Sequence, residues 1–109
     1  MSTVTSTETA WQWPADVLEL AARHHAEGYL QPLLEATRRL FPTAQGLRVF
    51  VENDPELRDV RFLVFEVRVP ADDIPDYGAA QHGWTDELLR IYPAPRTCPF
   101  CLTLIPVKP

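Results

Sequence analysis

Two cysteines and a run of acidic residues are the parts of this chain whose types and spacing most suggest chemistry. Cys98 and Cys101 have the Cys-x-x-Cys spacing of redox and zinc sites. In a redox site the pair opens a helix whose N-terminus stabilises the thiolate, but the sequence Leu-Thr-Leu-Ile that follows here is typical of a strand. A structural zinc ion needs four ligands, and the pair supplies two. We therefore expect buried structural thiols and no cofactor, and keep Cys98 and Cys101 as weak metal candidates.

The three histidines add little to these candidates. His24 and His25 are adjacent, and neighbouring side chains on a helix diverge by about 100°, so the two rarely bind one ion together. They complete a zinc site with Cys98 and Cys101 only if the tertiary structure happens to bring these distant segments together. His82 lies between apolar residues of an expected helix and is interpreted as a partly exposed surface residue.

An acidic turn joins two expected strands and invites comparison with nucleases that hold Mg²⁺ on an Asp and a Glu-x-Lys motif. If the hairpin closes across residues 53–59, Glu52 opposes Val60. Glu66 then lies roughly 20 Å from Asp54 at ~3.3 Å per residue, too far for both carboxylates to reach one ion. The turn is therefore interpreted as a solvated loop or as a negatively charged docking surface for a basic partner. The residues of that surface are Glu52, Asp54, Glu56 and Asp59.

Glu66 is an acid on an otherwise apolar strand face. It can pair with Arg68 on its own strand or with Arg48 on the neighbouring strand. A catalytic general base would also be an acid on such a face, but no nucleophile or second acid accompanies it. A structural ion pair is the preferred interpretation.

Length and charge restrict the possible classes of function. A chain of 109 residues forms one domain. Fifteen acidic against ten basic residues give a net charge of −5, and the basic residues are spread along the chain, so no binding to nucleic acid is expected. No apolar run approaches the ~18–20 residues of a membrane span. Residues 1–10 are expected to be a disordered polar leader, and residues 11–109 a cytoplasmic domain.

Two short helices are expected in the first half of the chain. Asp16 is expected to cap the first helix, with Glu19 reaching back to it in a capping box. Gly28 is expected to end that helix in the left-handed conformation. One helix kinked between residues 28 and 32 is the alternative. The second helix begins near Pro32 and directs an apolar stripe to the core: Leu30, Leu33, Leu34, Thr37, Leu40 and Phe41.

The second half of the chain alternates in the manner of strands. Residues 47–51 form the first strand, and residues 60–69 are apolar on both faces, which predicts a central strand or a second face that meets a partner. A third helix precedes a last strand over residues 98–107. The order α-α-β-β-α-β predicts a single α+β domain with a mainly antiparallel three-stranded sheet packed against helices. The apolar stripe of the third helix consists of Tyr77, Ala80, Trp84, Leu88 and Ile91.

The three tryptophans have different expected roles. Trp84 fits the core stripe of the third helix. Trp11 and Trp13 precede the first helix, and they either fold back onto the domain or reach another subunit. In the second case they would serve as interface residues, among which tryptophan is enriched.

The hairpin and the last strand also carry a likeness to known sequences. The segments Glu52-Asn-Asp-Pro-Glu56, Phe62-Leu-Val-Phe-Glu-Val67 and Phe100-Cys-Leu-Thr-Leu104 resemble those of short bacterial proteins of about this length, for which no activity is established. The resemblance covers residues 15–105 and implies a small stand-alone cytosolic domain. It transfers no functional residues.

The function expected from these features is protein binding. The net acidity, the acidic turn and the long two-faced strand favour a small accessory protein, antitoxin-like or immunity-like, that docks on a protein partner or forms a homodimer. If the helices cover one face of the sheet only, apolar side chains on the other face form an exposed patch, and such patches mark interfaces. The predicted partner-binding residues are Phe50, Phe62, Val64, Glu52, Asp54, Glu56, Asp59, Trp11 and Trp13.

Two other classes of function stay open at this point. An enzyme of unrecognised type would use Glu66, His82 or the histidines of the first helix in a pocket between helices and sheet. A small-molecule or metal sensor would use the Cys-x-x-Cys pair and Trp84.

Overall fold

The computed structural model describes residues 12–58, 60–92 and 99–108. The expected leader and Trp11 lie outside these ranges, as do Asp59 and Cys98. The element order confirms the predicted α+β domain and its sequence α-α-β-β-α-β. The helices are α2 (Ala15–Arg23), α3 (Leu30–Leu40) and α4 (Tyr77–Ile91), with short 3₁₀ turns η1 (Glu27–Tyr29) and η2 (Ala71–Asp73), and the strands are β1 (Gly46–Asn53), β2 (Arg61–Pro70) and β3 (Phe100–Val107).

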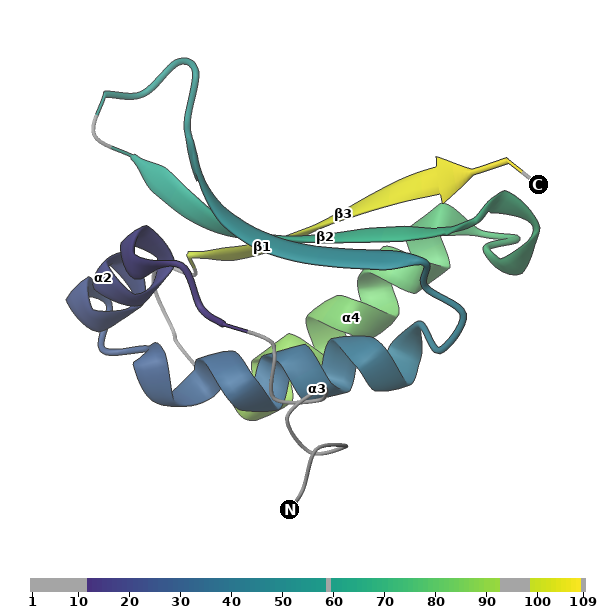
Figure 1. Cartoon of the computed structure of the whole chain (residues 1–109), viewed down its shortest axis with the longest axis horizontal. Helices are drawn as coiled ribbons and strands as arrows, with labels where there is room; N and C mark the ends of the chain where they lie inside the picture. Colours follow the sequence, from purple (N-terminus) through teal and green to yellow (C-terminus); the bar gives the residue numbers. More distant parts are fainter. Residues whose placement is uncertain (1–11, 59, 93–98, 109) are drawn as a thin grey trace.

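The three strands form a mixed sheet in the order β1-β2-β3. β1 and β2 pair antiparallel as a hairpin, whereas β2 and β3 pair parallel. The parallel pair follows from the chain path, because α4 carries the chain back along the sheet before β3 begins. All three α-helices lie on one face of the sheet, so the described part of the domain has two layers (Figure 1).

The core fills the space between the sheet and the helices. β2 is its centre: Leu63, Phe65 and Val67 are fully buried and point toward the helices. Strand alternation explains this arrangement, since every second side chain of a strand faces the same side. The helices contribute the other half of the core, mainly Val17, Leu20 and Ala21 of α2, Leu30, Leu33 and Leu34 of α3, and Trp84 and Leu88 of α4.

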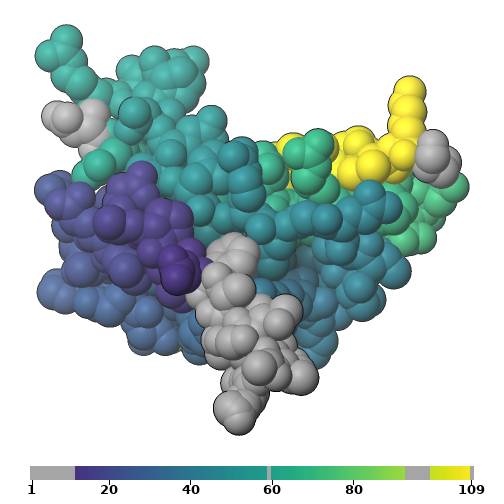
Figure 2. All heavy atoms as spheres, viewed as in Figure 1, coloured from purple at the N-terminus to yellow at the C-terminus, as the bar shows by residue number. Residues whose placement is uncertain are grey.

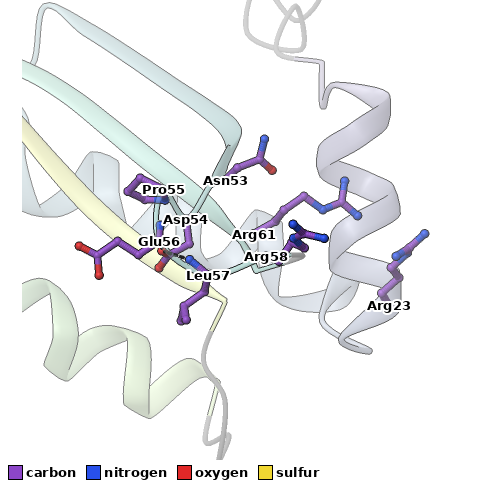
Figure 3. A pocket seen from close by; sticks show the side chains of 8 residues that line it. All are labelled: Arg23, Asn53, Asp54, Pro55, Glu56, Leu57, Arg58 and Arg61. Atoms are coloured by element: carbon purple, nitrogen blue, oxygen red, sulfur yellow. Dashed lines mark hydrogen bonds between the residues drawn. The ribbon is translucent and has the colours of Figure 1, made fainter.

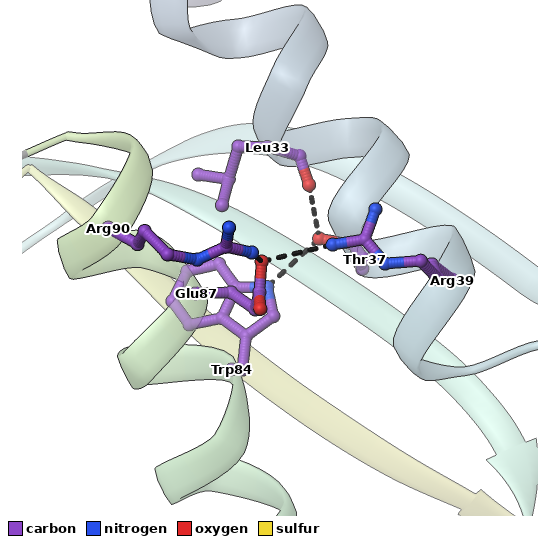
Figure 4. Close-up of polar contacts among 6 residues, drawn as sticks. All are labelled: Leu33, Thr37, Arg39, Trp84, Glu87 and Arg90. Atoms are coloured by element: carbon purple, nitrogen blue, oxygen red, sulfur yellow. Dashed lines mark hydrogen bonds and ion pairs between the residues drawn. The ribbon is translucent and has the colours of Figure 1, made fainter.

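A buried hydrogen-bond chain joins α4 to α3 inside this core. The indole Nε1 of Trp84 donates to Oγ1 of Thr37 at 2.9 Å, and that hydroxyl donates to the carbonyl oxygen of Leu33 at 2.7 Å (Figure 4). The Trp84 ring also packs against Phe65 with ring centroids 5.9 Å apart. The indole N–H of Trp84 thus has a hydrogen-bond acceptor in the core, where no water can provide one.

An exposed ion-pair group lies above this chain and joins the same two helices. Glu87 of α4 accepts from Arg39 of α3 at 3.0 Å and also contacts Arg90 one turn along α4 (Figure 4). Exposed pairs of this kind contribute ~0–1 kcal/mol each. The buried Trp84–Thr37 bond is therefore the more important connection between α3 and α4.

The ends of the first helix differ from the sequence prediction. Asp16 lies inside the first turn of α2 and does not cap it, because the helix already begins at Ala15 behind Pro14. At the other end His25, not Gly28, takes the left-handed conformation, with φ of 54°. The capping-box prediction and the glycine prediction were therefore wrong, and α2 and α3 are separate helices rather than one kinked helix.

A Schellman motif explains why the first helix ends at this point. The amide of Ala26 donates to the carbonyl oxygen of Ala21 at 2.7 Å, and the amide of His25 donates to that of Ala22 at 3.0 Å. The turn buries Ala26 completely against the core. Burial of Ala26 thus offsets the cost of a left-handed histidine.

Two members of the expected core stripes lie at the surface. Leu40 is 37% exposed and Tyr77 is 38% exposed. Leu40 is the last residue of α3 and Tyr77 the first of α4, so each lies where its helix extends past the packed layer. The expected stripes were correct in the helix centres and wrong at these ends.

Replacing Thr37 with valine tests the buried hydrogen-bond chain. Thr37→Val keeps the side-chain shape but leaves the indole N–H of Trp84 without its acceptor, so the free energy of unfolding falls by about 1–3 kcal/mol in urea titration. The double variant Thr37→Val/Trp84→Phe loses less than the sum of the single changes, because both polar groups are gone. Thr85→Val, at an exposed position of α4, is the matched control and changes stability by less than ~0.5 kcal/mol.

Replacing residues 25 and 28 tests the helix end. His25→Gly raises the free energy of unfolding by about 1 kcal/mol, since glycine adopts positive φ without strain. Gly28→Ala also raises it, by ~0.4–1 kcal/mol, because a Cβ at position 28 meets no atom within 4 Å and φ there is not positive. Thermal and urea unfolding measure both changes. A loss of stability in Gly28→Ala would contradict this assignment.

Candidate functional site

The face of the sheet that points away from the helices has no covering layer among the described residues (Figure 1). We call this surface the open face. Its side chains follow from the strand register, since residues paired across strands point to the same side. The open face consists of Arg48, Phe50 and Glu52 of β1, Phe62, Val64, Glu66 and Arg68 of β2, and Cys101, Thr103, Ile105 and Val107 of β3.

The open face combines apolar side chains with charged ones. The strand register brings Phe50, Phe62 and Val64 together, as predicted, because Phe50 lies opposite Val64 and Phe62 is two residues further along β2. Both phenylalanines are half-buried, whereas Val64 is 1% exposed, since it lies in the central strand between longer side chains. Val64 therefore packs beneath the two phenylalanine rings and offers little surface of its own to a partner.

Two apolar members of the open face were not predicted from the sequence. Ile105 and Val107 are half-buried on β3, next to β2. The sequence alternation shows that Ile105 and Val107 lie on one side of the strand, opposite Leu104 and Pro106. It does not show which of the two sides the helices cover, so the sequence could not assign these residues to the open face. The space-filling view shows the surface along this side of the molecule hollowed between the raised hairpin and the C-terminal end of β3 (Figure 2).

A charged pair lies in the middle of the open face. Nε of Arg48 donates to Oε1 of Glu66 at 3.0 Å, and a second nitrogen lies 3.4 Å from Oε2. Of the two partners considered for Glu66, the structure selects Arg48 on the neighbouring strand. The guanidinium carbon of Arg48 also lies 4.5 Å from the centre of the Phe50 ring, within the range of a cation–π interaction. Glu66 is buried, so this pair holds a carboxylate where water cannot solvate it.

The hairpin loop lies one residue later than the sequence prediction placed it, over residues 54–60 instead of 53–59, and this moves the partner of Glu52 by two residues. Glu52 opposes Phe62, not Val60, and the amide of Asp54 donates to the carbonyl oxygen of Val60 at 2.8 Å. The prediction was wrong because the side chain of Asp54 builds the turn itself. Its Oδ1 accepts the amides of Glu56 and Leu57 at 2.8 and 2.9 Å, as in an Asx turn.

The hairpin tip carries both signs of charge. Glu52 and Glu56 are exposed and Asp54 is half-buried, and their role as a docking surface for a basic partner stays a prediction. Arg58 and Arg61 belong to the same hairpin, however, and line one cavity with Arg23 of α2 and with Asp54 and Glu56 (Figure 3). The basic residues are spread along the sequence, but the fold places Arg23 in the lining of the same cavity as Arg58 and Arg61.

The remaining candidates are spread over the molecule. Trp13 is half-buried and packs against the core, which is the first of the two roles considered for it. Cys101 is half-buried on the open face. Glu66 lies on the open face, whereas His82 is exposed on α4 on the other side of the sheet, 3.9 Å from Asp86. The structure therefore does not bring the proposed general base and this histidine together.

The described ranges contain neither a metal-binding cluster nor a membrane-spanning helix. No three His, Cys, Asp or Glu side chains of residues 12–58, 60–92 and 99–108 are placed to hold a metal ion. No helix in this part of the chain has the length and apolar composition of a membrane span.

Comparison with known proteins gave no relative. No family model, no curated protein and no solved structure matches this chain. The resemblance of the hairpin to short bacterial proteins therefore stays a prediction, and function has to be argued from the geometry of the open face and the hairpin tip.

Removing one partner of the central ion pair tests its role. Arg48→Met leaves the buried carboxylate of Glu66 without a counter-ion, so the free energy of unfolding at pH 7 falls by about 1–3 kcal/mol in urea titration. The double variant Arg48→Met/Glu66→Met recovers part of that loss, because no uncompensated charge stays in the sheet.

The matched control is the same substitution at an exposed ion pair. Arg23 lies 3.9 Å from Glu19, and both side chains are more than 60% exposed. Arg23→Met is expected to change stability by less than ~0.5 kcal/mol. Equal losses in Arg23→Met and Arg48→Met would show that burial of Glu66 has no energetic consequence.

Proposed function

We propose that this chain is a small protein-binding module that works through its open face, and that a second copy of the chain is the occupant of that face. The observation that carries the proposal is a sheet face with half-buried apolar side chains that no described element covers, opposite a face that three helices cover (Figure 1). Large exposed apolar surfaces usually mark interaction sites.

The parallel pair of strands strengthens this argument. Antiparallel sheets commonly leave one face in water, whereas sheets made only of parallel strands almost always have both faces covered; the present sheet is mixed. β2 and β3 are parallel, and β2 is buried on both sides over residues 63–67. A partner on the open face would give this pair the covering that parallel strands usually have.

The charges of the open face favour a second copy. Glu52 lies near the hairpin end of the face and Arg68 near the opposite end, where it pairs with Gly46. In a symmetric pair whose two-fold axis runs across the strands, each β1 lies over the partner's β1 in the opposite direction. Glu52 then lies over the partner's Gly46, next to Arg68 on the partner's β2, and the reverse contact forms at the other end. A two-fold axis along β2 would instead place identical charges together, which is unfavourable.

The size of the face predicts a weak dimer. The eight paired positions along the three strands span roughly 26 Å by 14 Å, so two open faces bury on the order of 1,000 Å² in total once the height of the side chains is included. This area lies at the low end of specific interfaces, where weak and transient complexes are found. A reversible module fits an accessory protein of the antitoxin or immunity kind, and the cytoplasm stays its predicted location because the cysteines suit a reducing compartment.

Sedimentation equilibrium over micromolar to millimolar concentrations tests self-association. The wild-type chain is expected to form a reversible dimer, and Phe50→Asp or Phe62→Asp to weaken it by tenfold or more, because an aromatic ring loses its burial of about 1.5–3 kcal/mol. Leu89→Asp is the matched control: Leu89 is 53% exposed on α4, on the other side of the molecule, and its replacement leaves the dimer unchanged.

A charge exchange tests the orientation of the two copies without removing apolar residues. Glu52→Arg alone and Arg68→Glu alone each place like charges together and weaken the dimer severalfold. The double variant Glu52→Arg/Arg68→Glu restores the wild-type dissociation constant. A chain that stays monomeric throughout this range contradicts self-association, and a double variant no better than the single ones contradicts the proposed orientation.

A further inference from the structure

A cavity of about 680 Å³ lies between the hairpin tip and the end of α2, apart from the open face. Three arginines line it, from segments that are separate in sequence: Arg23 in the last turn of α2, Arg58 in the hairpin loop and Arg61 at the start of β2. Figure 3 shows Arg58 and Arg61 extending from the hairpin toward the helix that carries Arg23. The fold thus gathers positive charge in one cavity of an acidic chain.

These arginines have few partners of opposite charge. Within the described ranges, no carboxylate oxygen lies within 4.0 Å of a side-chain nitrogen of Arg58 or Arg61. Arg23 has one such neighbour, Glu19 at 3.9 Å, in a pair that is largely exposed to water. Arginines that come together without carboxylates repel one another, and a bound anion relieves that repulsion.

The two acids that line the cavity do not neutralise it. Asp54 uses Oδ1 to accept the amides of Glu56 and Leu57, so this oxygen is held in the turn. The carboxylate of Glu56 points away from the arginines (Figure 3). Among the described residues of the lining, three guanidinium groups stand against two carboxylates, a charge of +1 in a chain whose net charge is −5.

We propose that this cavity binds a small phosphorylated molecule through its phosphate group. Guanidinium groups donate two parallel hydrogen bonds to an oxyanion, and several of them around one site match a doubly charged phosphate better than a single carboxylate. No aromatic side chain is among the described residues that line the cavity, so these residues recognise the phosphate and not a ring. Asp54 keeps the hairpin turn in the shape that presents Arg58.

Titration with inorganic pyrophosphate, followed by ¹H–¹⁵N NMR of the full chain, tests the proposal. The expected result is a saturable shift of amide signals from residues 53–58, 61 and 23, with a sub-millimolar dissociation constant that rises with salt. Sodium chloride at the same ionic strength gives no saturable shift. Linear shifts spread over the whole surface would overturn the proposal, because they indicate screening and no site.

Variants separate a built site from general charge attraction. Arg58→Gln/Arg61→Gln is expected to weaken pyrophosphate binding by tenfold or more, and Arg23→Gln severalfold. Arg58→Lys/Arg61→Lys keeps the charge and loses the paired hydrogen bonds, so it falls between the wild type and the glutamine variant. Arg38→Gln, at an exposed position of α3 outside the cavity lining, is the control with one positive charge fewer and binds as the wild type does.

Equal weakening by Arg38→Gln and by the cavity variants would overturn the proposal, because net charge alone would then explain binding. The cavity arginines are not part of the open face, so their glutamine variants are expected to dimerise as the wild type does. Failure of this site and failure of the proposed dimer are therefore independent results.

Discussion

The crossover through α4 is the constraint on which the rest of the structure depends. β3 runs parallel to β2, so the chain has to travel back along the sheet, and the helix that carries it must lie on one face. Trp84 holds α4 there by packing against Phe65 and by donating its indole N–H to Thr37 of α3. α2 and α3 pack on the same face, so the apolar stripes of the helices are all used on one side of the sheet (Figure 1).

The open face is the direct consequence of this one-sided arrangement. Its central strand buries both sets of side chains, while the aromatic rings of Phe50 and Phe62 are left half-buried at the surface. Glu66 is also only partly provided for by this arrangement. Its carboxylate is buried, but its counter-ion, Arg48, lies on the edge strand and is largely exposed. A second layer on this face would bury the remaining exposed parts of Phe50 and Phe62. For this reason the geometry favours association with a partner as the function.

The chain carries a net negative charge, but one region of its surface is positively charged. The chain is acidic as a whole, but the hairpin tip combines exposed carboxylates with the arginine-lined cavity beside α2. The Asx turn at Asp54 connects the two, because one carboxylate shapes the loop that carries Arg58. The hairpin therefore offers a recognition surface distinct from the open face, and a positively charged cavity that the net charge does not reveal.

The sequence by itself determined the element order, the hairpin and the partnership of Phe50, Phe62 and Val64, because strand and helix periods depend on residues close together in the chain. It also limited the partner of Glu66 to two arginines. Tertiary structure alone decided the remaining features: the direction of β3, the face that the helices cover, the one-residue shift of the hairpin loop at Asp54 and the meeting of Arg23 with the hairpin arginines. The physical reason is that most of these features depend on packing and hydrogen bonds between distant segments. The hairpin shift depends on the Asx turn formed by the side chain of Asp54. Neither produces a periodic pattern in the sequence.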